Sequence, residues 1–208
     1  SAASDVYKRQ AFVREISKMY KGIVQLVIGL MMIVTLLVGY LPIPEYLVEL
    51  TCVSNMLGGV LLTIDGILSI CRKKNLSSNL YRAVCVCILT VFLICLGSLT
   101  GFFHFNFKGA FFFLHVINPI AFVGCYLLFC NDAERCIVSA ANFITPVLML
   151  VYLLFDYIRC QFTGKFVYGF AEPDVLTFPY AVLIGIAVYI IMMLFSVCLL
   201  KVNKVIHR

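Results

Sequence analysis

Six long apolar runs, separated by short polar loops, fill most of the 208-residue chain. Each run has roughly 18–25 residues, enough helix to cross about 30 Å of hydrocarbon at about 1.5 Å rise per residue. A helix satisfies its own backbone hydrogen bonds in lipid, and none of the runs alternates like a barrel strand. The pattern predicts an all-α, polytopic membrane protein, a bundle of six transmembrane helices. The runs cover Ile23–Tyr40, Leu47–Ile70, Ala83–Phe103, Ala110–Cys130, Cys136–Ile158 and Phe178–Leu200.

Composition agrees with a membrane domain. Hydrophobic residues make up 63% of the chain and charged residues 12%, about half the charged share of a soluble domain. The formal charge of +6 would suggest nucleic acid in a soluble protein, but here the basic residues lie in loops and at the ends. We therefore expect no nucleic-acid partner, membrane lipids as the surroundings, and a multi-pass location in the cell membrane.

Basic residues are distributed unequally between the two sets of loops. One side holds Lys108, Arg159 and Lys165, whereas the other holds most of the remaining Lys and Arg. Because basic residues are retained on the cytoplasmic side, the asymmetry predicts that both termini are cytoplasmic. The residues on that side are Arg14, Lys18, Lys21, Arg72, Lys73, Lys74, Arg82, Arg135, Lys201, Lys204 and Arg208.

The first ten residues differ in origin, on our interpretation, from the rest. Asp5–Gln10 reads DVYKRQ, the peptide obtained by translating a transposon end widely used in sequencing libraries. We expect residues 1–10 to be a non-native, library-derived segment. Residues 11–208 then form a single six-helix transmembrane domain.

The ten cysteines do not predict a metal site or a disulfide framework. No C-x-x-C is present, and Cys85 and Cys87, two apart in a helix, point to different sides. A free Cys inside a span behaves as a small apolar residue. The chain also lacks a G-x-G-x-x-G motif and a pair of His residues for haem. We therefore expect no metal and no cofactor.

Polar residues inside the spans are costly in lipid and usually face a cavity or another helix. In the second span Thr51, Ser54 and Asn55 are spaced i, i+3, i+4 on one face. Asp65 lies close to the same face, nearly four turns further on, and we expect it to face the bundle interior and to be protonated or hydrogen-bonded to a neighbour.

The fourth span carries His115 and Asn118, three residues apart, followed by Pro119, which should loosen the helix locally. The second and fourth spans both enter from the outer side. Thr51 and His115 should therefore lie at matching depth, about one turn inside. A His can activate a hydroxyl by taking its proton, if the two groups come within hydrogen-bond reach. The alternative is that His115 and Thr51 only bond backbone or amide groups between packed helices.

A family resemblance appears at these residues. Leu50-Thr51 before an apolar run, and Phe113-Leu114-His115-Val116 followed by Pro119, resemble the androgen-induced family of six-helix membrane proteins and its bacterial relatives. The stretch Thr163–Phe170 (TGKFVYGF) is similar to the T-G-x-W-V-Y-P-F-like motif that the family carries before its last helix. Phe166 replaces the Trp of that motif and Gly169 replaces the Pro.

The resemblance implies a chemistry. In animal members a membrane-embedded Thr and His are implicated in hydrolysing fatty-acid esters of hydroxy fatty acids, and the motifs align these residues with Thr51 and His115. The segment Cys52–Asn55 looks more like the bacterial relatives, so the substrate does not follow from the resemblance.

Two interpretations stay open. In the first, the protein is an intramembrane hydrolase of lipid esters. Thr51 is then the nucleophile, His115 is the base, and Ser54, Asn55 or Asn118 stabilises an oxyanion. In the second, it is a non-enzymatic protein that binds or transports a small lipid or solute. The pattern does not specify an oligomeric state.

The outer loop between the fifth and sixth spans, from Arg159 to Thr177, is rich in aromatic residues. We expect it to fold back over the helix ends as a membrane-surface lid. Tyr168 would then line the binding surface of the site.

Overall fold

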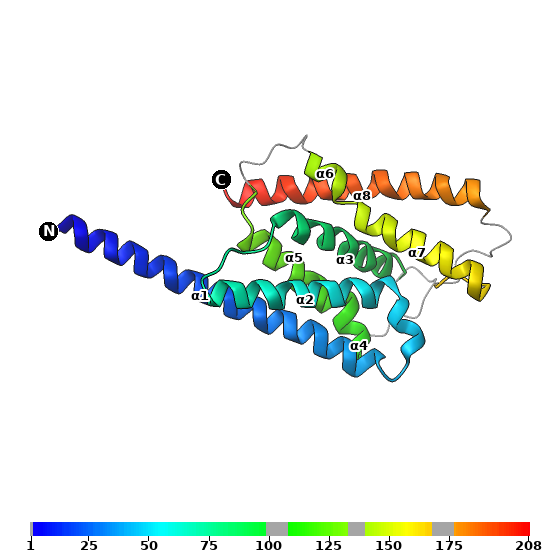
Figure 1. Cartoon of the computed structure of the whole chain (residues 1–208), viewed down its shortest axis with the longest axis horizontal. Coiled ribbons are helices and arrows are strands. Elements are labelled where there is room, and N and C mark those ends of the chain that lie inside the picture. The colour runs from blue at the N-terminus through cyan, green and yellow to red at the C-terminus, as the bar shows by residue number, and fades with distance from the viewer. Residues whose placement is uncertain (1, 99–107, 133–139, 168–176) are drawn as a thin grey trace.

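The computed structural model of the chain describes residues 2–98, 108–132, 140–167 and 177–208, and within these ranges all regular structure is helical (Figure 1). The expectation of an all-α protein is therefore confirmed for the described residues. The elements are α1 (Ala2–Tyr40), η1 (Pro44–Val48, a 3₁₀ helix), α2 (Leu50–Ile70), α3 (Ser78–Ser98), α4 (Gly109–Phe112), η2 (Phe113–Ile117, a π-helical turn), α5 (Asn118–Phe129), α6 (Ala140–Ile144), α7 (Val147–Thr163) and α8 (Phe178–Ile206).

Five helical stretches among the described residues are long and apolar enough to cross a membrane. A sixth apolar stretch, Ser78–Leu93 in α3, is shorter. The helices thus fit a membrane protein, with five or six candidate spans. The five long stretches are Tyr7–Tyr40, Leu50–Ile70, Gly109–Phe129, Asn142–Thr163 and Phe178–Ile206.

Several boundaries differ from those that the hydrophobic pattern predicts. α3 begins at Ser78 instead of Ala83, because the Ser77 hydroxyl accepts a hydrogen bond from the Asn79 N–H and caps the helix. The predicted fifth span is broken between α6 and α7, at Pro146, which has no N–H to continue the first helix. The N-terminal half of α1 projects beyond the bundle (Figure 1).

The closest helix packing joins α1 to α2, which run antiparallel with glycines facing one another. A Cβ built on Gly29 would lie 2.6 Å from Thr63 Oγ1 and 2.7 Å from the carbonyl oxygen of Gly59. One heptad earlier, a Cβ on Gly22 would lie 2.8 Å from the Gly66 carbonyl oxygen. Small residues let helix backbones approach in lipid, and these pairs fix the register of α2 against α1.

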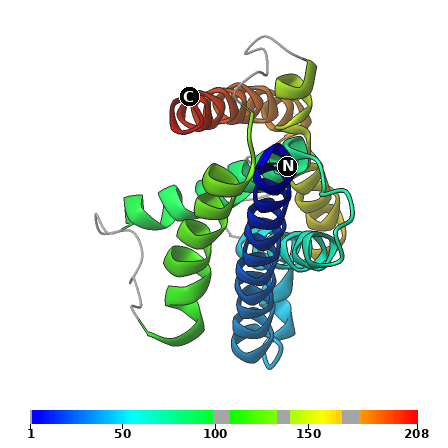
Figure 2. The ribbon, with the colours of Figure 1, turned by 90° about the vertical axis from the view of Figure 1, so that its left-hand side faces the viewer.

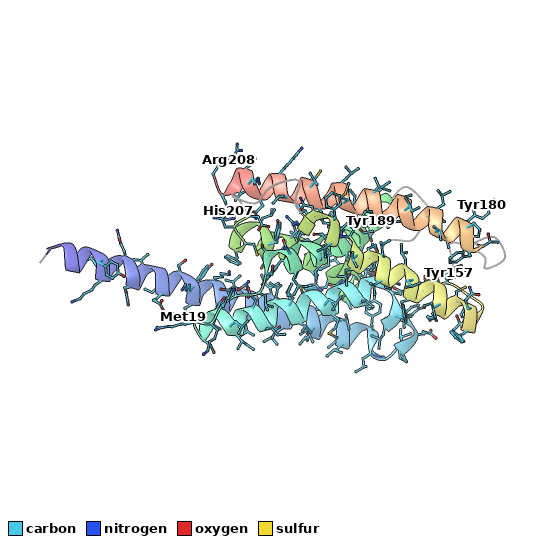
Figure 3. All side chains as sticks on the ribbon, turned by 45° about the horizontal axis from the view of Figure 1, so that its top comes forward. Met19, Tyr157, Tyr180, Tyr189, His207 and Arg208 are labelled. Atoms are coloured by element: carbon cyan, nitrogen blue, oxygen red, sulfur yellow. The ribbon has the colours of Figure 1, made fainter. Side chains whose placement is uncertain are left out.

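The other helices pack around this pair with unequal burial. Seen from one end, α8 crosses the side of the molecule away from α1 (Figure 2), and most of its surface is exposed. Tyr157 and Tyr180 lie at one end of the bundle, whereas His207 and Arg208 lie at the other (Figure 3). A lipid-facing helix has no need for a polar outer face, so the exposed apolar surface of α8 fits a membrane environment.

A buried network surrounds Asp65, which is 1% exposed. We call it the Asp65 network; it comprises Gln25, Asp65, Ser69, Asn75 and Tyr81. The Asp65 carboxylate accepts hydrogen bonds from Gln25 Nε2 (2.9 Å), Tyr81 Oη (2.8 Å), Asn75 Nδ2 (3.0 Å) and the Leu76 N–H (2.7 Å). The network ties the α2–α3 loop to three helices. It confirms that Asp65 faces the interior and is hydrogen-bonded there.

A second buried network lies around Asp132. Its carboxylate accepts from Ser78 Oγ (2.6 Å) and Tyr126 Oη (3.0 Å) and lies 3.8 Å from Arg82 Nη1. Arg82 is therefore fully buried in α3, not a solvated loop residue as its position between two predicted spans suggests. Asn203 of α8 accepts from the Asp132 N–H (2.9 Å) and joins the last helix to this network.

Candidate active site

The helix that carries His115 contains one widened turn. α4, η2 and α5 form a continuous helix from Gly109 to Phe129, and the Asn118 N–H bonds the carbonyl of Phe113, five residues back. Pro119 follows at once and has no N–H to donate. The sequence expectation that Pro119 loosens this helix is confirmed, and the loosening takes the form of a π turn centred on His115.

In the widened turn the Leu114 carbonyl receives a hydrogen bond from outside the helix. In the five-residue register of Asn118, the partner of the Leu114 carbonyl would be the N–H of residue 119, which proline lacks. Asn55 of α2 supplies the missing donor, with its Nδ2 3.0 Å from the Leu114 oxygen. A buried carbonyl without a donor is costly, so this bond pins η2 against α2.

Thr51 and His115 lie side by side across this contact. Thr51 Oγ1 is 3.4 Å from His115 Nε2, a separation that is long for a hydrogen bond but within reach of proton transfer after a small closure. Both side chains are buried, with exposed fractions of 2% and 9%. The predicted proximity of the two residues is confirmed; their catalytic role stays a prediction.

The other ring nitrogen of His115 fixes its tautomer. Nδ1 lies 2.9 Å from the carbonyl oxygen of Phe111, and because a carbonyl only accepts, Nδ1 must carry the proton. In the neutral ring Nε2 then presents a lone pair to Thr51, the arrangement that a general base requires. The ring of Phe111 stacks on the imidazole with centroids 4.0 Å apart and holds its plane.

The amides of Asn55 and Asn118 form a chain beneath the pair. Asn55 Nδ2 donates to the carbonyl of Thr51 (2.8 Å) as well as to that of Leu114, and Asn118 Nδ2 donates to Asn55 Oδ1 (2.9 Å). Ser54 Oγ donates to the Thr51 carbonyl at 3.3 Å. An oxyanion role for Ser54, Asn55 or Asn118 would require that residue to give up one of these bonds. Asn118 Oδ1 is buried and accepts no hydrogen bond within the described part of the chain.

Part of the predicted site lies outside the described residues. These undescribed residues are 168–176, which include Tyr168 and about half of the predicted lid. In the described part, the residues from Arg159 to Thr163 are the last turns of α7, not loop. Phe162 there is 86% exposed. The helix continues through these residues and is capped at Gly164, whose positive φ of 72° suits a glycine.

Three residues at the site escaped the sequence interpretation. Thr35 of α1 accepts from Asn118 Nδ2 at 3.2 Å, Phe111 holds the His115 ring, and Tyr152 of α7 donates to the carbonyl of Val48 at 3.1 Å, just before α2. Thr35 is a polar residue inside an apolar run, which could have marked it. The roles of Phe111 and Tyr152 depend on backbone carbonyls, which no residue pattern reveals.

Comparison with known proteins adds no assignment. No family model, no curated protein and no solved structure matches the chain. Within the described ranges, no group of three or more His, Cys, Asp or Glu side chains is arranged to hold a metal ion. We call the polar residues around the pair the Thr51 cluster; they are Thr35, Thr51, Asn55, His115 and Asn118.

Proposed function

We propose that the protein is an intramembrane hydrolase of lipid esters, with Thr51 as nucleophile and His115 as general base. The observation that carries the proposal is the buried approach of Thr51 Oγ1 to His115 Nε2, 3.4 Å apart, with the other ring nitrogen occupied by a carbonyl. Nucleophile, base and a group that orients the base are the three parts that activated hydroxyl catalysis needs. The resemblance to the androgen-induced family supports the same pair.

The reaction follows from this geometry. Thr51 Oγ1 attacks the ester carbonyl carbon as its proton passes to His115 Nε2. The alcohol then leaves with that proton, and an acyl-threonine remains. A water molecule, deprotonated by the same Nε2, attacks the acyl carbon; the acid is released and Oγ1 regains its proton. The carbonyl of Phe111 keeps Nδ1 protonated throughout and stabilises the imidazolium that forms twice in the cycle.

The surroundings of the pair favour an aliphatic ester that enters laterally from the membrane. Leu36, Cys52 and Leu114 pack together around the site, and all three are almost fully buried.

We further propose six spans with both termini in the cytoplasm and a location in the cell membrane. Support comes from Tyr157 and Tyr180 at one end of the bundle and His207 and Arg208 at the other (Figure 3).

A second candidate function is non-enzymatic binding or transport of a small lipid or solute. Two observations favour it: both members of the pair are buried, and the amide protons of Asn55 are spent on backbone carbonyls. On this view the polar groups hold α2 against the wide turn and the hydroxyl–imidazole contact is structural.

A hydrolase probe separates the two functions. Protein in lipid nanodiscs is incubated with a lipid-directed fluorophosphonate, and labelling is followed by mass spectrometry of the modified residue. The hydrolase proposal expects labelling at Thr51, none in Thr51→Ala, and a rate lowered about a hundredfold or more in His115→Ala, the usual size of a lost general base. Labelling that is unchanged in either variant, or absent from folded wild type, would overturn the hydrolase and leave the binding protein.

A further inference from the structure

Asn55 touches the two backbone segments that carry the reacting side chains. One amide proton goes to the carbonyl of Thr51 itself (2.8 Å), and the other goes to the carbonyl of Leu114, the neighbour of His115 (3.0 Å). A single planar NH₂ group has its two protons in a fixed geometry. The side chain therefore sets the separation between α2 and η2 at the level of the pair.

The orientation of this amide is itself fixed. Asn55 Oδ1 accepts from Asn118 Nδ2 at 2.9 Å, and the same Nδ2 also reaches Thr35 Oγ1 at 3.2 Å. Because Asn55 Oδ1 faces a donor and its Nδ2 faces two carbonyls, the flipped amide would lose all three bonds. Asn55 and Asn118 are both 0% exposed, so bulk water does not replace the bonds.

The wide turn makes α2 the source of the missing donor. The Asn118 N–H, the α-helical donor of the Leu114 carbonyl, bonds the Phe113 carbonyl instead, and the next donor in the five-residue register would be residue 119, a proline. Leu114 is also 0% exposed. If Asn55 loses its amide, the Leu114 carbonyl regains a donor only by moving. The movement takes His115 with it, since His115 is the next residue in the turn.

We propose that Asn55 is the positioning residue of the Thr51–His115 pair, acting through the carbonyls of Thr51 and Leu114 to hold Oγ1 within reach of Nε2. As a reaction claim this rests on the proposed hydrolase function. The claim about the distance between residues 51 and 115 does not rest on that function, because this distance can be measured without any turnover. The proposal also removes Asn55 from the candidates for an oxyanion donor.

The separation between the side chains at 51 and 115 can be tested with a metal ion that binds both. In Thr51→Cys the sulfur takes the place of Oγ1, opposite His115 Nε2. A tetrahedral metal with about 2.3 Å to sulfur and about 2.0–2.1 Å to nitrogen holds these atoms roughly 3.5 Å apart, which matches the observed 3.4 Å. Co²⁺ added to this variant is detected through the absorption of its thiolate bond, as the difference from protein with Thr51 intact. Thr51→Cys/His115→Ala gives the affinity without the second ligand.

Asn203 offers a matched control. Its Nδ2 donates to the carbonyls of Cys130 (2.8 Å) and Tyr126 (3.4 Å), its Oδ1 accepts from the Asp132 N–H, and it is 0% exposed. The same chemistry thus occurs in α8, away from the pair. Asn203→Ala reports the general cost of losing such an amide.

In the Thr51→Cys background, Asn55→Ala should weaken Co²⁺ binding about tenfold or more, as loss of a group that orients a metal ligand does, whereas Asn203→Ala should leave it within about twofold. With Thr51 intact, Asn55→Ala should lower the maximal rate of probe labelling while the probe concentration at half-maximal rate changes little, because alignment and not probe binding is lost. If Asn55→Ala does not fold, Asn118→Ala, which frees the amide of Asn55, should act in the same direction with a smaller effect.

The outcomes distinguish the two claims. Unchanged Co²⁺ affinity in folded Asn55→Ala, or an equal loss in Asn203→Ala, would overturn the positioning role whatever the labelling shows. Weakened Co²⁺ binding in a protein whose wild type is never labelled would support the positioning role and overturn the hydrolase.

Discussion

The Asp65 network and the Thr51 cluster are both buried and polar, yet they are satisfied to different degrees. The Asp65 carboxylate accepts four hydrogen bonds of 2.7–3.0 Å. The Thr51 cluster contains a contact of 3.4 Å and an amide oxygen, Asn118 Oδ1, without a donor in the described structure. A saturated network rigidifies a fold, whereas an incompletely satisfied one keeps polar capacity for another molecule. On the proposed function, the Asp65 network serves stability and the Thr51 cluster serves the reaction.

α1 connects the two regions. Gln25 reaches the Asp65 network and Thr35 reaches the Thr51 cluster, ten residues further along the same helix. The glycine contacts between Gly29 and Gly59 lie between them. The position of α1 against α2 therefore affects both regions at once. Substitutions in the Asp65 network, in the Thr51 cluster or at the glycine contact between them can each test the difference between the two regions.

The largest effect is expected from Asp65→Leu. The substitution removes the acceptor of the buried Gln25 and Tyr81 donors and of the partly buried Asn75 and Leu76 donors, so the protein should lose about 3–5 kcal/mol of stability. Melting in detergent can be followed with a maleimide dye, because the thiols of buried cysteines react as the bundle opens.

Asp156→Leu is the control for this prediction. Asp156 accepts one hydrogen bond, from the Val167 N–H at 3.0 Å, and is only partly buried, so its loss should cost about 1 kcal/mol. Equal melting temperatures for the two variants would mean that Asp65 is not held by a saturated network.

An intermediate effect is expected from Gly29→Ala. The new methyl would lie 2.6 Å from Thr63 Oγ1 and 2.7 Å from the Gly59 carbonyl, so α1 must move away from α2 at a cost of about 1–3 kcal/mol. Because α1 reaches both regions, the melting temperature and the rate of probe labelling should fall together. Gly185→Ala, where a Cβ meets nothing within 4 Å, should change neither. A drop in melting temperature with unaltered labelling would separate the two regions.

The smallest effect is expected from Thr35→Val. It removes the acceptor of the 3.2 Å bond from Asn118. It also removes the hydroxyl's bonds to the carbonyls of Met31 and Met32 within α1, which contribute little to the tertiary fold. Stability should fall by about 0.5–1.5 kcal/mol, and labelling of Thr51 should decrease less than twofold. A loss of labelling as large as that of Asn55→Ala would make Thr35, not Asn55, the anchor of the amide chain.

The helical architecture followed from the sequence because length and hydropathy are local properties. The equal depth of Thr51 and His115 was also predicted, since two helices with the same direction place residues one turn inside at the same level, but their contact at 3.4 Å depends on which helix faces meet. Pro119 predicted an irregular helix at this point, but whether the irregularity is a kink or a widened turn depends on the donor that Asn55 provides from another helix. Arg82 was misplaced for a similar reason, because its partner Asp132 lies fifty residues away in the chain.

The glycine pairs of α1 and α2 were not predicted either. Gly22 and Gly29 are spaced by seven, as are Gly59 and Gly66. This spacing predicts a contact only when α2 is known to run beside α1. The role of Phe111 was hidden for another reason: its carbonyl, common to every residue, selects the tautomer of His115.

The wide turn also makes the site sensitive to chain length. Each residue of an α-helix turns the chain by about 100°, and the five-residue bond between Asn118 and Phe113 accommodates one residue more than an α-helical turn does. The segment before the turn is therefore one residue out of phase with the segment after it. His115 faces α2 while Phe122 still faces the core. A relative with one residue fewer between Phe111 and Pro119 could keep every polar side chain of the site and still present its imidazole to a different neighbour.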